Sequence, residues 1–136
     1  MNQTTPSIHK QQIATSAAPT AIGPYSQGIK VGTMVFFSGQ IPLDPQTGDL
    51  ISGSIEQETE RVMANMEAAL AGAQLTFNHV VKTTIYLTDL ANFATVNEIY
   101  GRFFSDPAPA RACVEVSALP KGCNIEIEWI ACCSDK

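Results

Sequence analysis

An apolar stripe at helical spacing in residues 54–73 is the feature that most constrains how this chain can fold. Ser54 with Gln57 fits an N-terminal capping box, the glutamates that follow suit the positive end of a helix, and Gly72 fits a helix stop. The stripe consists of Ile55, Val62, Met63, Met66, Ala69, Leu70 and Ala73. It predicts an amphipathic helix whose apolar face packs on another layer of structure, not a ligand site.

Strand signals elsewhere in the chain predict a sheet as that second layer. Segments rich in β-branched or aromatic residues, or with alternating polarity, occur at residues 8–15, 29–31, 34–37, 79–87, 111–118 and 125–133. The second and third of these flank Gly32-Thr33 and fit a hairpin. A second helix is predicted to begin at Asp89 or Asn92 and to be broken by residues 106–109. Its apolar side carries Phe93, Val96, Tyr100, Phe103 and Phe104.

The resulting order of elements, β-β-β-α-β-α-β-β, predicts an α+β fold. Two helices on one face of a single-layer mixed sheet are the economical packing for that order. Residues 1–7 are predicted to be a flexible N-terminal tail, and residues 8–136 one domain. Residues 17–25 and 42–48 contain the prolines and glycines of loops.

Charge content indicates which kinds of partner the surface of the chain can bind. Charged residues make up 15% of the 136 residues, against about 25% in an average globular domain. So little charge leaves surplus apolar surface, which an oligomer would bury; a monomer rich in Ser, Thr and Gln is the alternative. The formal charge of −5 argues against nucleic-acid binding and against docking on anionic membranes. A polar N-terminal segment and the lack of a long apolar run predict a cytoplasmic protein with no membrane span.

Cofactor and metal motifs are missing from the sequence. Residues 23–28 have the G-x-x-x-x-G spacing of a phosphate loop, but no Lys-Ser/Thr pair follows. The chain has no C-x-x-C pair, and only His9 and His79 could join a cysteine at a metal, so no metal site is predicted. Free thiols are predicted at Cys113, Cys123, Cys132 and Cys133. An enzyme with this sequence is therefore expected to work without a cofactor.

Three residues stand out as candidates for chemistry. Arg111 follows a proline-rich loop and opens a strand, where its planar guanidinium could hold a carboxylate through two hydrogen bonds. Glu126, between two isoleucines in a predicted strand, could orient or activate a water molecule. Both have an ordinary alternative, an ion pair with an oppositely charged neighbour. Tyr25, in a loop, is either a packing aromatic or a phenol at a pocket mouth.

Several segments taken together closely resemble the Rid family, the family of reactive intermediate deaminase A (RidA/YjgF). The strand that contains Pro-Ala-Arg, followed at a fixed distance by the Ile-Glu-Ile strand, is the specific part of the pattern. The resemblance covers residues 13–131, nearly the whole chain. It rests on residues 23–28 (GPYSQG), 38–42 (SGQIP), 81–84, 93–97, 109–116 (PARACVEV), 119–122 (LPKG) and 125–128 (IEIE).

This resemblance implies a chorismate-mutase-like α+β fold and a homotrimer with active sites between subunits. It also implies a 2-iminobutanoate/2-iminopropanoate deaminase, which hydrolyses small 2-imino acids to 2-oxo acids and ammonia without a cofactor. In that reaction Arg111 would hold the substrate carboxylate and Glu126 would position the attacking water. The resemblance adds Tyr25 to Glu126 as a catalytic residue. It places further substrate-binding residues at Ser38, Gly39, Asn97 and Cys113, and the Cys113 thiol is not required as a nucleophile.

Two rival functions stay open at the level of sequence. A non-catalytic regulatory module that binds small carboxylates would use the same Arg111 pocket. Ribonuclease or chaperone activity is attributed to some relatives, and the acidic composition argues against RNA cleavage. RNA binding would need the basic residues gathered on one surface, namely Lys30, Lys82, Arg102 and Lys121.

Overall fold

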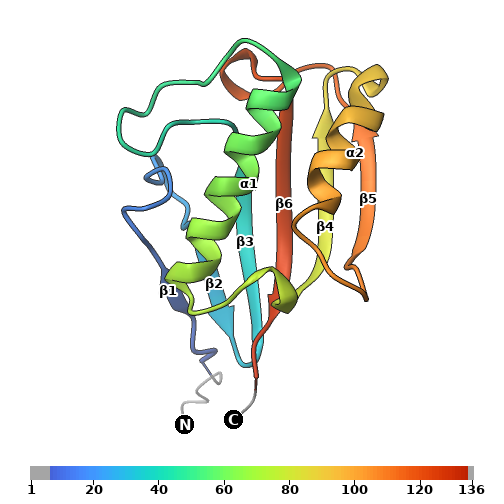
Figure 1. Cartoon of the computed structure of the whole chain (residues 1–136). Helices are drawn as coiled ribbons and strands as arrows, with labels where there is room; N and C mark the ends of the chain where they lie inside the picture. Colours follow the sequence, from blue (N-terminus) through green and yellow to red (C-terminus); the bar gives the residue numbers. More distant parts are fainter. Residues whose placement is uncertain (1–6, 135–136) are drawn as a thin grey trace, which may run out of the picture.

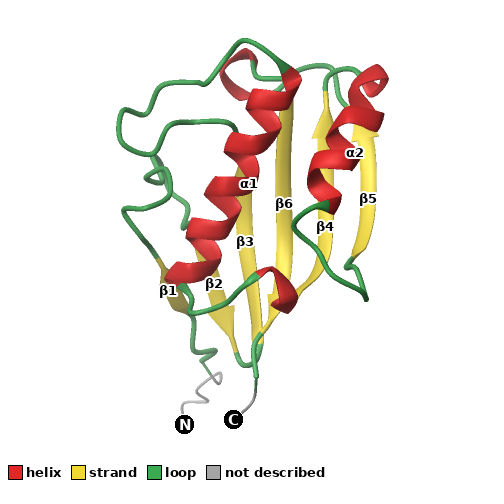
Figure 2. Ribbon diagram, in the orientation of Figure 1, coloured by secondary structure: helices red, strands yellow, loops and turns green. Residues whose placement is uncertain are grey.

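A mixed sheet with both helices on one of its faces makes up the computed structural model, which describes residues 7–134 (Figures 1 and 2). The six strands lie in the order β1-β2-β3-β6-β4-β5, and only β4 and β5 run parallel. This confirms the predicted α+β class and the predicted element order. Most of the predicted tail, residues 1–6, lies outside the described residues. The elements are β1 Gln11–Ile13, β2 Gly28–Val31, β3 Met34–Gln40, α1 Ile55–Gly72, β4 Val80–Leu87, α2 Phe93–Gly101, β5 Ala110–Glu115 and β6 Ile125–Cys132.

The predicted hairpin is confirmed, but the first strand is shorter than expected. Val31 pairs with Met34 across a two-residue turn, in which Gly32 has a φ of 60° that glycine adopts without strain. β1 was predicted to run to residue 15 and ends at Ile13. Beyond it, the backbone of Thr15 is hydrogen-bonded by the side chain of Gln27 and not by a neighbouring strand.

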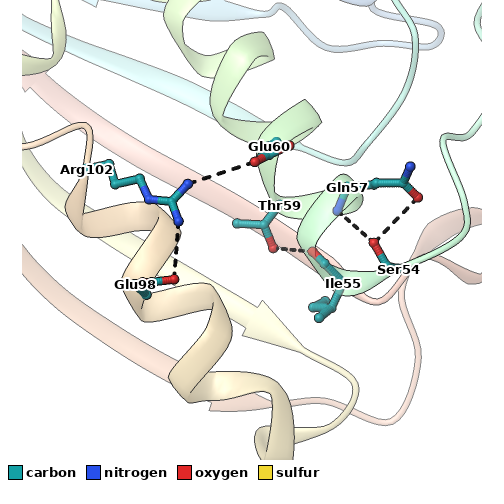
Figure 3. Close-up of polar contacts among 7 residues, drawn as sticks. All are labelled: Ser54, Ile55, Gln57, Thr59, Glu60, Glu98 and Arg102. Atoms are coloured by element: carbon teal, nitrogen blue, oxygen red, sulfur yellow. Dashed lines mark hydrogen bonds and ion pairs between the residues drawn. The ribbon is translucent and has the colours of Figure 1, made fainter.

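Helix α1 begins as predicted, but a different residue from the predicted one ends it. The Ser54 hydroxyl accepts a hydrogen bond from the Gln57 backbone N–H at 3.1 Å (Figure 3). The stop comes from Gln74, whose φ of 62° closes a Schellman turn, and not from Gly72. Gly72 lies against β1: a Cβ there would come within 3.0 Å of a Thr15 side-chain carbon. The glycine therefore permits close packing of α1 on the N-terminal segment.

The second helix also differs from its prediction at both ends. Asp89 caps a short 3-10 turn, residues Leu90–Asn92, by accepting the Ala91 N–H at 2.9 Å. Asn92 precedes α2 without a capping hydrogen bond from its side chain, and the helix ends at Gly101, before the prolines. The two phenylalanines expected on its last turn lie just beyond it and pack on the ring of Phe77, at centroid distances of 5.3 and 5.2 Å.

The hydrophobic core lies between the sheet and the two helices. Along β6, Ile125, Ile127 and Trp129 are buried, and Trp129 stacks on Phe37 of β3 at 4.7 Å. The intervening residues of each strand face away from the helices, as the alternation predicted. Within one chain that second face is uncovered, and Phe36 and Val114 are 47% and 42% exposed. We call it the open face.

On the outer surface, Arg102 joins the two helices. Its guanidinium lies 3.3 Å from Glu98 on α2 and 4.0 Å from Glu60 on α1 (Figure 3). All three side chains are more than half exposed. Exposed pairs of this kind contribute less than about 1 kcal/mol each to the free energy of unfolding, so the core, not this network, holds the helices in place.

Candidate functional site

A cavity of about 360 Å³ lies at the end of β3 and contains four of the seven residues predicted for the site: Tyr25, Ser38, Gly39 and Glu126. Apolar side chains complete much of the wall, including Ile41, Leu43 and two prolines. Four segments therefore meet at this cavity: loop 17–25, strand β3, the loop after β3, and strand β6. A concave pocket with a few polar groups among apolar side chains is the usual form of a small-molecule site.

An irregularity in β3 shapes the floor of this cavity. The pairing of β3 with β6 shifts register between Phe37 and Gln40. Within that bulge the Ser38 hydroxyl donates to the Ser26 carbonyl at 2.6 Å, and its backbone N–H donates to the Gln27 carbonyl at 3.0 Å. Bulges of this kind redirect side chains and often occur beside functional sites.

Gly39 is required because the carboxylate of Glu126 lies across it. A Cβ built on Gly39 would overlap Glu126 Oε2, and the next two atoms of that side chain would lie at 2.9 and 3.0 Å. Any larger residue would displace the carboxylate. The floor of the cavity and the orientation of Glu126 are therefore coupled.

Glu126 is a half-buried carboxylate without a cationic partner. It lies on the open face, and the ion pairs of the described residues all involve Arg102, so the alternative that Glu126 pairs with a cationic neighbour in its own chain is wrong. Burial, and secondly repulsion from Glu128, raise the pKa of Glu126 above its ordinary value. Glu128 is held by the Tyr86 hydroxyl, which donates to it at 2.9 Å. A carboxylate with a raised pKa is a stronger base and therefore accepts a proton from water more readily.

Tyr25 lies at the mouth of the cavity, 53% exposed, and its phenol makes no hydrogen bond with another described residue. The buried side-chain amide of Gln27 holds the loop that carries Tyr25. It accepts a hydrogen bond from the Thr15 N–H at 2.7 Å and donates to the carbonyls of Thr15 and Pro19 at 3.0 and 2.8 Å. Gln27 was not singled out from the sequence; a glutamine next to a strand shows no pattern that marks it as buried.

Two polar residues of α1 support the site and were also missed. Asn65 is fully buried and donates to the carbonyls of Ile41 and Leu43, at 3.2 and 2.9 Å, so it holds the cavity wall. Glu58 is 4% exposed and accepts from the backbone and side-chain nitrogens of Asn124, at 2.9 and 2.6 Å. That contact fixes the start of β6, two residues before Glu126. A polar residue inside an apolar helical stripe is the signal that could have identified Asn65.

The other three predicted residues, Arg111, Asn97 and Cys113, gather between β5 and α2. Arg111 Nη1 donates to Asn97 Oδ1 at 2.7 Å. Its guanidinium carbon lies 5.4 Å from the centre of the Phe93 ring and 5.1 Å from that of Tyr100. The alternative that Arg111 pairs with an acidic neighbour in its own chain is wrong, because the ion pairs of the described chain do not include it. Most of its donors are free to bind an external anion.

Cys113 is half-buried beside Arg111. Burial raises the pKa of its thiol, and the positive charge of Arg111 lowers it less than burial raises it. The thiol is therefore protonated at neutral pH and poorly suited to act as a nucleophile.

The two groups of predicted residues do not meet within one chain. Strand β4 separates β5 from β6 in the sheet. Arg111 is paired with Thr83, which is buried under the helices, whereas Glu126 is paired with Tyr86 on the open face. The sequence placed both residues on neighbouring terminal segments and carried no sign of this separation.

Metal ligands do not cluster in the described part of the chain: no group of three or more His, Cys, Asp or Glu side chains could hold an ion. The four cysteines are free thiols, as predicted. Across residues 7–134, none of the helices combines the length and apolarity needed to cross a bilayer.

Comparison with known proteins gives consistent matches over almost the whole chain. The model of a family described as endoribonuclease L-PSP matches residues 15–133. Protein DfrA of Myxococcus xanthus is 54% identical over 90% of this chain and 95% of its own length. The 2-iminobutanoate/2-iminopropanoate deaminase of Homo sapiens is 47% identical over 92% of this chain and 91% of its own length. The structure of E. coli TdcF with bound serine superposes with a TM-score of 0.86, at 43% identity, covering 91% of this chain and 99% of that one.

Proposed function

The chain belongs to the endoribonuclease L-PSP family, which includes the Rid proteins, and on that premise we propose that it hydrolyses small 2-imino acids to 2-oxo acids and ammonia. The observation that carries the proposal is the state of Arg111, whose guanidinium is held in place and has no acidic partner in its own chain. The human relative, named as such a deaminase, supports the choice of substrate class.

Arg111 binds the substrate carboxylate in this proposal. Its planar fork matches the two oxygens of a carboxylate, and one nitrogen is already fixed by Asn97. The backbone of Cys113, two residues further along β5 than Arg111, completes the anion site. That TdcF binds serine, a small carboxylate, is compatible with an anion site of this size.

Glu126 acts on water. The substrate carbon is already electrophilic because it is doubly bonded to nitrogen, so no cofactor is needed. With the substrate nitrogen protonated as the iminium, Glu126 accepts a proton from water as the water oxygen bonds to the carbon, and the C=N double bond becomes the single bond of a neutral carbinolamine. Glu126 then returns that proton to the nitrogen, and the new hydroxyl loses its proton to Glu126 or solvent as the C–N bond breaks, leaving the 2-oxo acid and ammonia. Tyr25 and Ser38 line the same cavity and confine the substrate.

The site is completed between subunits of a homotrimer. Arg111 and Glu126 face opposite sides of one sheet, so one active site needs them from two different chains. The uncovered open face, with its exposed apolar side chains, supplies surface for that association. The low charge content points the same way.

The rival functions receive less support. The basic residues that RNA binding would need are dispersed: Lys30 is on β2, Lys82 on β4 and Lys121 in the loop before β6, while Arg102 is paired with two glutamates. Because they come from separate segments, no single element supplies the basic stripe that RNA binding uses. A non-catalytic carboxylate binder would use the same Arg111, and turnover alone separates it from an enzyme.

The decisive experiment is hydrolysis of 2-iminopropanoate and 2-iminobutanoate, generated in the cuvette, by the wild type and by Arg111→Ala. We expect accelerated formation of 2-oxo acid by the wild type and a large loss in the variant, with both proteins sedimenting at three chain masses. Saturable binding of 2-oxobutanoate without any acceleration would favour the binding module. A stable monomer at micromolar concentration would contradict the site between subunits.

A further inference from the structure

The structure assigns to Phe93 and Tyr100 the role of positioning residues that hold the guanidinium of Arg111 in the plane required to bind a carboxylate. Both rings belong to α2, which covers β4 and β5 (Figure 1). Their centroids lie 5.4 and 5.1 Å from the guanidinium carbon, within the range of cation–π contact. This inference rests on the proposed role of Arg111.

The contacts act in place of a counter-ion. An arginine of a binding site is commonly held by a carboxylate, which would then compete with an anionic substrate. Here one nitrogen is fixed by a neutral amide, Asn97, and the guanidinium carbon lies over two aromatic rings. Aromatic faces attract the cation and leave its N–H donors unused. The group is therefore oriented in advance, and its positive charge remains available to the ligand.

Tyr100 is itself rigidly placed. It is 4% exposed, and its hydroxyl and that of Thr83 are 2.8 Å apart in a buried hydrogen bond. Thr83 is the β4 residue directly paired with Arg111 in the sheet. The backbone that carries Arg111 and the ring that supports its side chain are thus tied to the same residue. Phe93, at the first turn of α2, is only partly buried and supplies the second ring.

The test combines a ligand-free measurement with binding and kinetics. In the wild type, the ring currents should displace the Arg111 Nε–Hε resonance, and Phe93→Leu should move it toward the position of a free arginine. Phe93→Leu should weaken 2-oxobutanoate binding and lower kcat/KM by about three- to tenfold. Phe93→Tyr, which restores the ring, should recover both. Phe103→Leu, a matched change beyond the end of α2 and against Phe77, should leave the resonance and the affinity unchanged.

A double-mutant cycle separates positioning from general packing. If Phe93 acts through Arg111, Phe93→Leu should cause no further loss of kcat/KM in an Arg111→Ala background. An equal loss in both backgrounds, or an unmoved Arg111 resonance in Phe93→Leu, would overturn the inference. The resonance requires no substrate, so a protein that shows the shift but hydrolyses no imine would contradict the proposed function and leave the positioning role intact.

Discussion

Arg111 and Glu126 project from opposite faces of the same sheet. The strand pairing shows this directly: Arg111 lies beside buried Thr83, and Glu126 lies beside Tyr86 on the open face. Two residues three positions apart on one strand, as Thr83 and Tyr86 are on β4, necessarily face opposite sides. A reaction that needs both side chains at one substrate therefore needs two copies of the chain.

This arrangement predicts complementation between inactive variants. Arg111→Ala and Glu126→Gln should each be nearly inactive alone. Trimers reassembled from an equal mixture should recover activity, because about a quarter of the sites then combine an intact arginine with an intact glutamate from a neighbour. The measurement is hydrolysis rate after refolding the two proteins together, against each refolded alone. Failure to recover activity in verified mixed trimers would place both residues in one subunit's site, or outside it.

Conservative replacement of Arg111 should be costly. Arg111→Lys keeps the charge and loses the planar fork, the Asn97 geometry and the stacking, so affinity for 2-oxobutanoate should fall. Arg111→Ala should lose more, about 2–5 kcal/mol of binding free energy. Titration calorimetry gives both values. Arg102→Lys is the matched control on the outer surface, and its affinity should equal that of the wild type.

The pH dependence of turnover should report Glu126. Its carboxylate must be ionised to accept a proton, so kcat/KM should fall as pH drops through a pKa that lies above the ordinary carboxyl value. Glu128→Gln removes the repulsion that contributes to the raised pKa, and the acid limb of the profile should move to lower pH. Glu67→Gln makes the same charge change on an exposed turn of α1 and should leave the limb in place. If the acid limb of the profile stayed at the same pH in Glu128→Gln, a residue other than Glu126 would have to be the base.

The thiols should prove dispensable for catalysis. Burial raises the pKa of Cys113, so the thiolate is scarce at neutral pH, and Cys113→Ser should keep most of the activity. Burial raises the pKa of Cys123 to about 11 and leaves the residue 1% exposed, so its thiol should resist alkylation at pH 8 in the folded protein and react after denaturation. Mass spectrometry of alkylated peptides measures this. If Cys113→Ser lost as much activity as Arg111→Ala with its fold intact, a covalent mechanism would have to be considered.

Glu58 should contribute strongly to stability. Glu58→Ala leaves the Asn124 backbone N–H and side-chain amide without their buried acceptor, which should lower the free energy of unfolding by about 1–3 kcal/mol. Glu56→Ala, an exposed change in the same helical turn, should cost less than about 1 kcal/mol. Urea unfolding compares the two. Equal costs would show that the Asn124 contact adds nothing beyond the helix dipole.

The sequence by itself determined the elements whose signals are local. The start of α1 follows from Ser54 and the apolar spacing, and the hairpin from Gly32-Thr33 between two apolar runs. Both depend on residues within a few positions of one another. The end of β1 was predicted less well because it depends on a distant residue, Gln27, which holds Thr15. The end of α1 was predicted less well because Gln74, and not a glycine, adopts the left-handed conformation that closes the helix.

For the site, the sequence determined which residues have the right chemistry, and the tertiary structure decided which of them meet. Along β6, Glu126 alternates with buried isoleucines and faces away from the core, but strand order and register set its distance from Arg111. Only the packing of α2 on the sheet shows that Arg111 is held by Asn97 and two aromatic rings and not by an acid. Side-chain partners across the sheet are chosen by long-range packing, which leaves no periodic trace in the sequence.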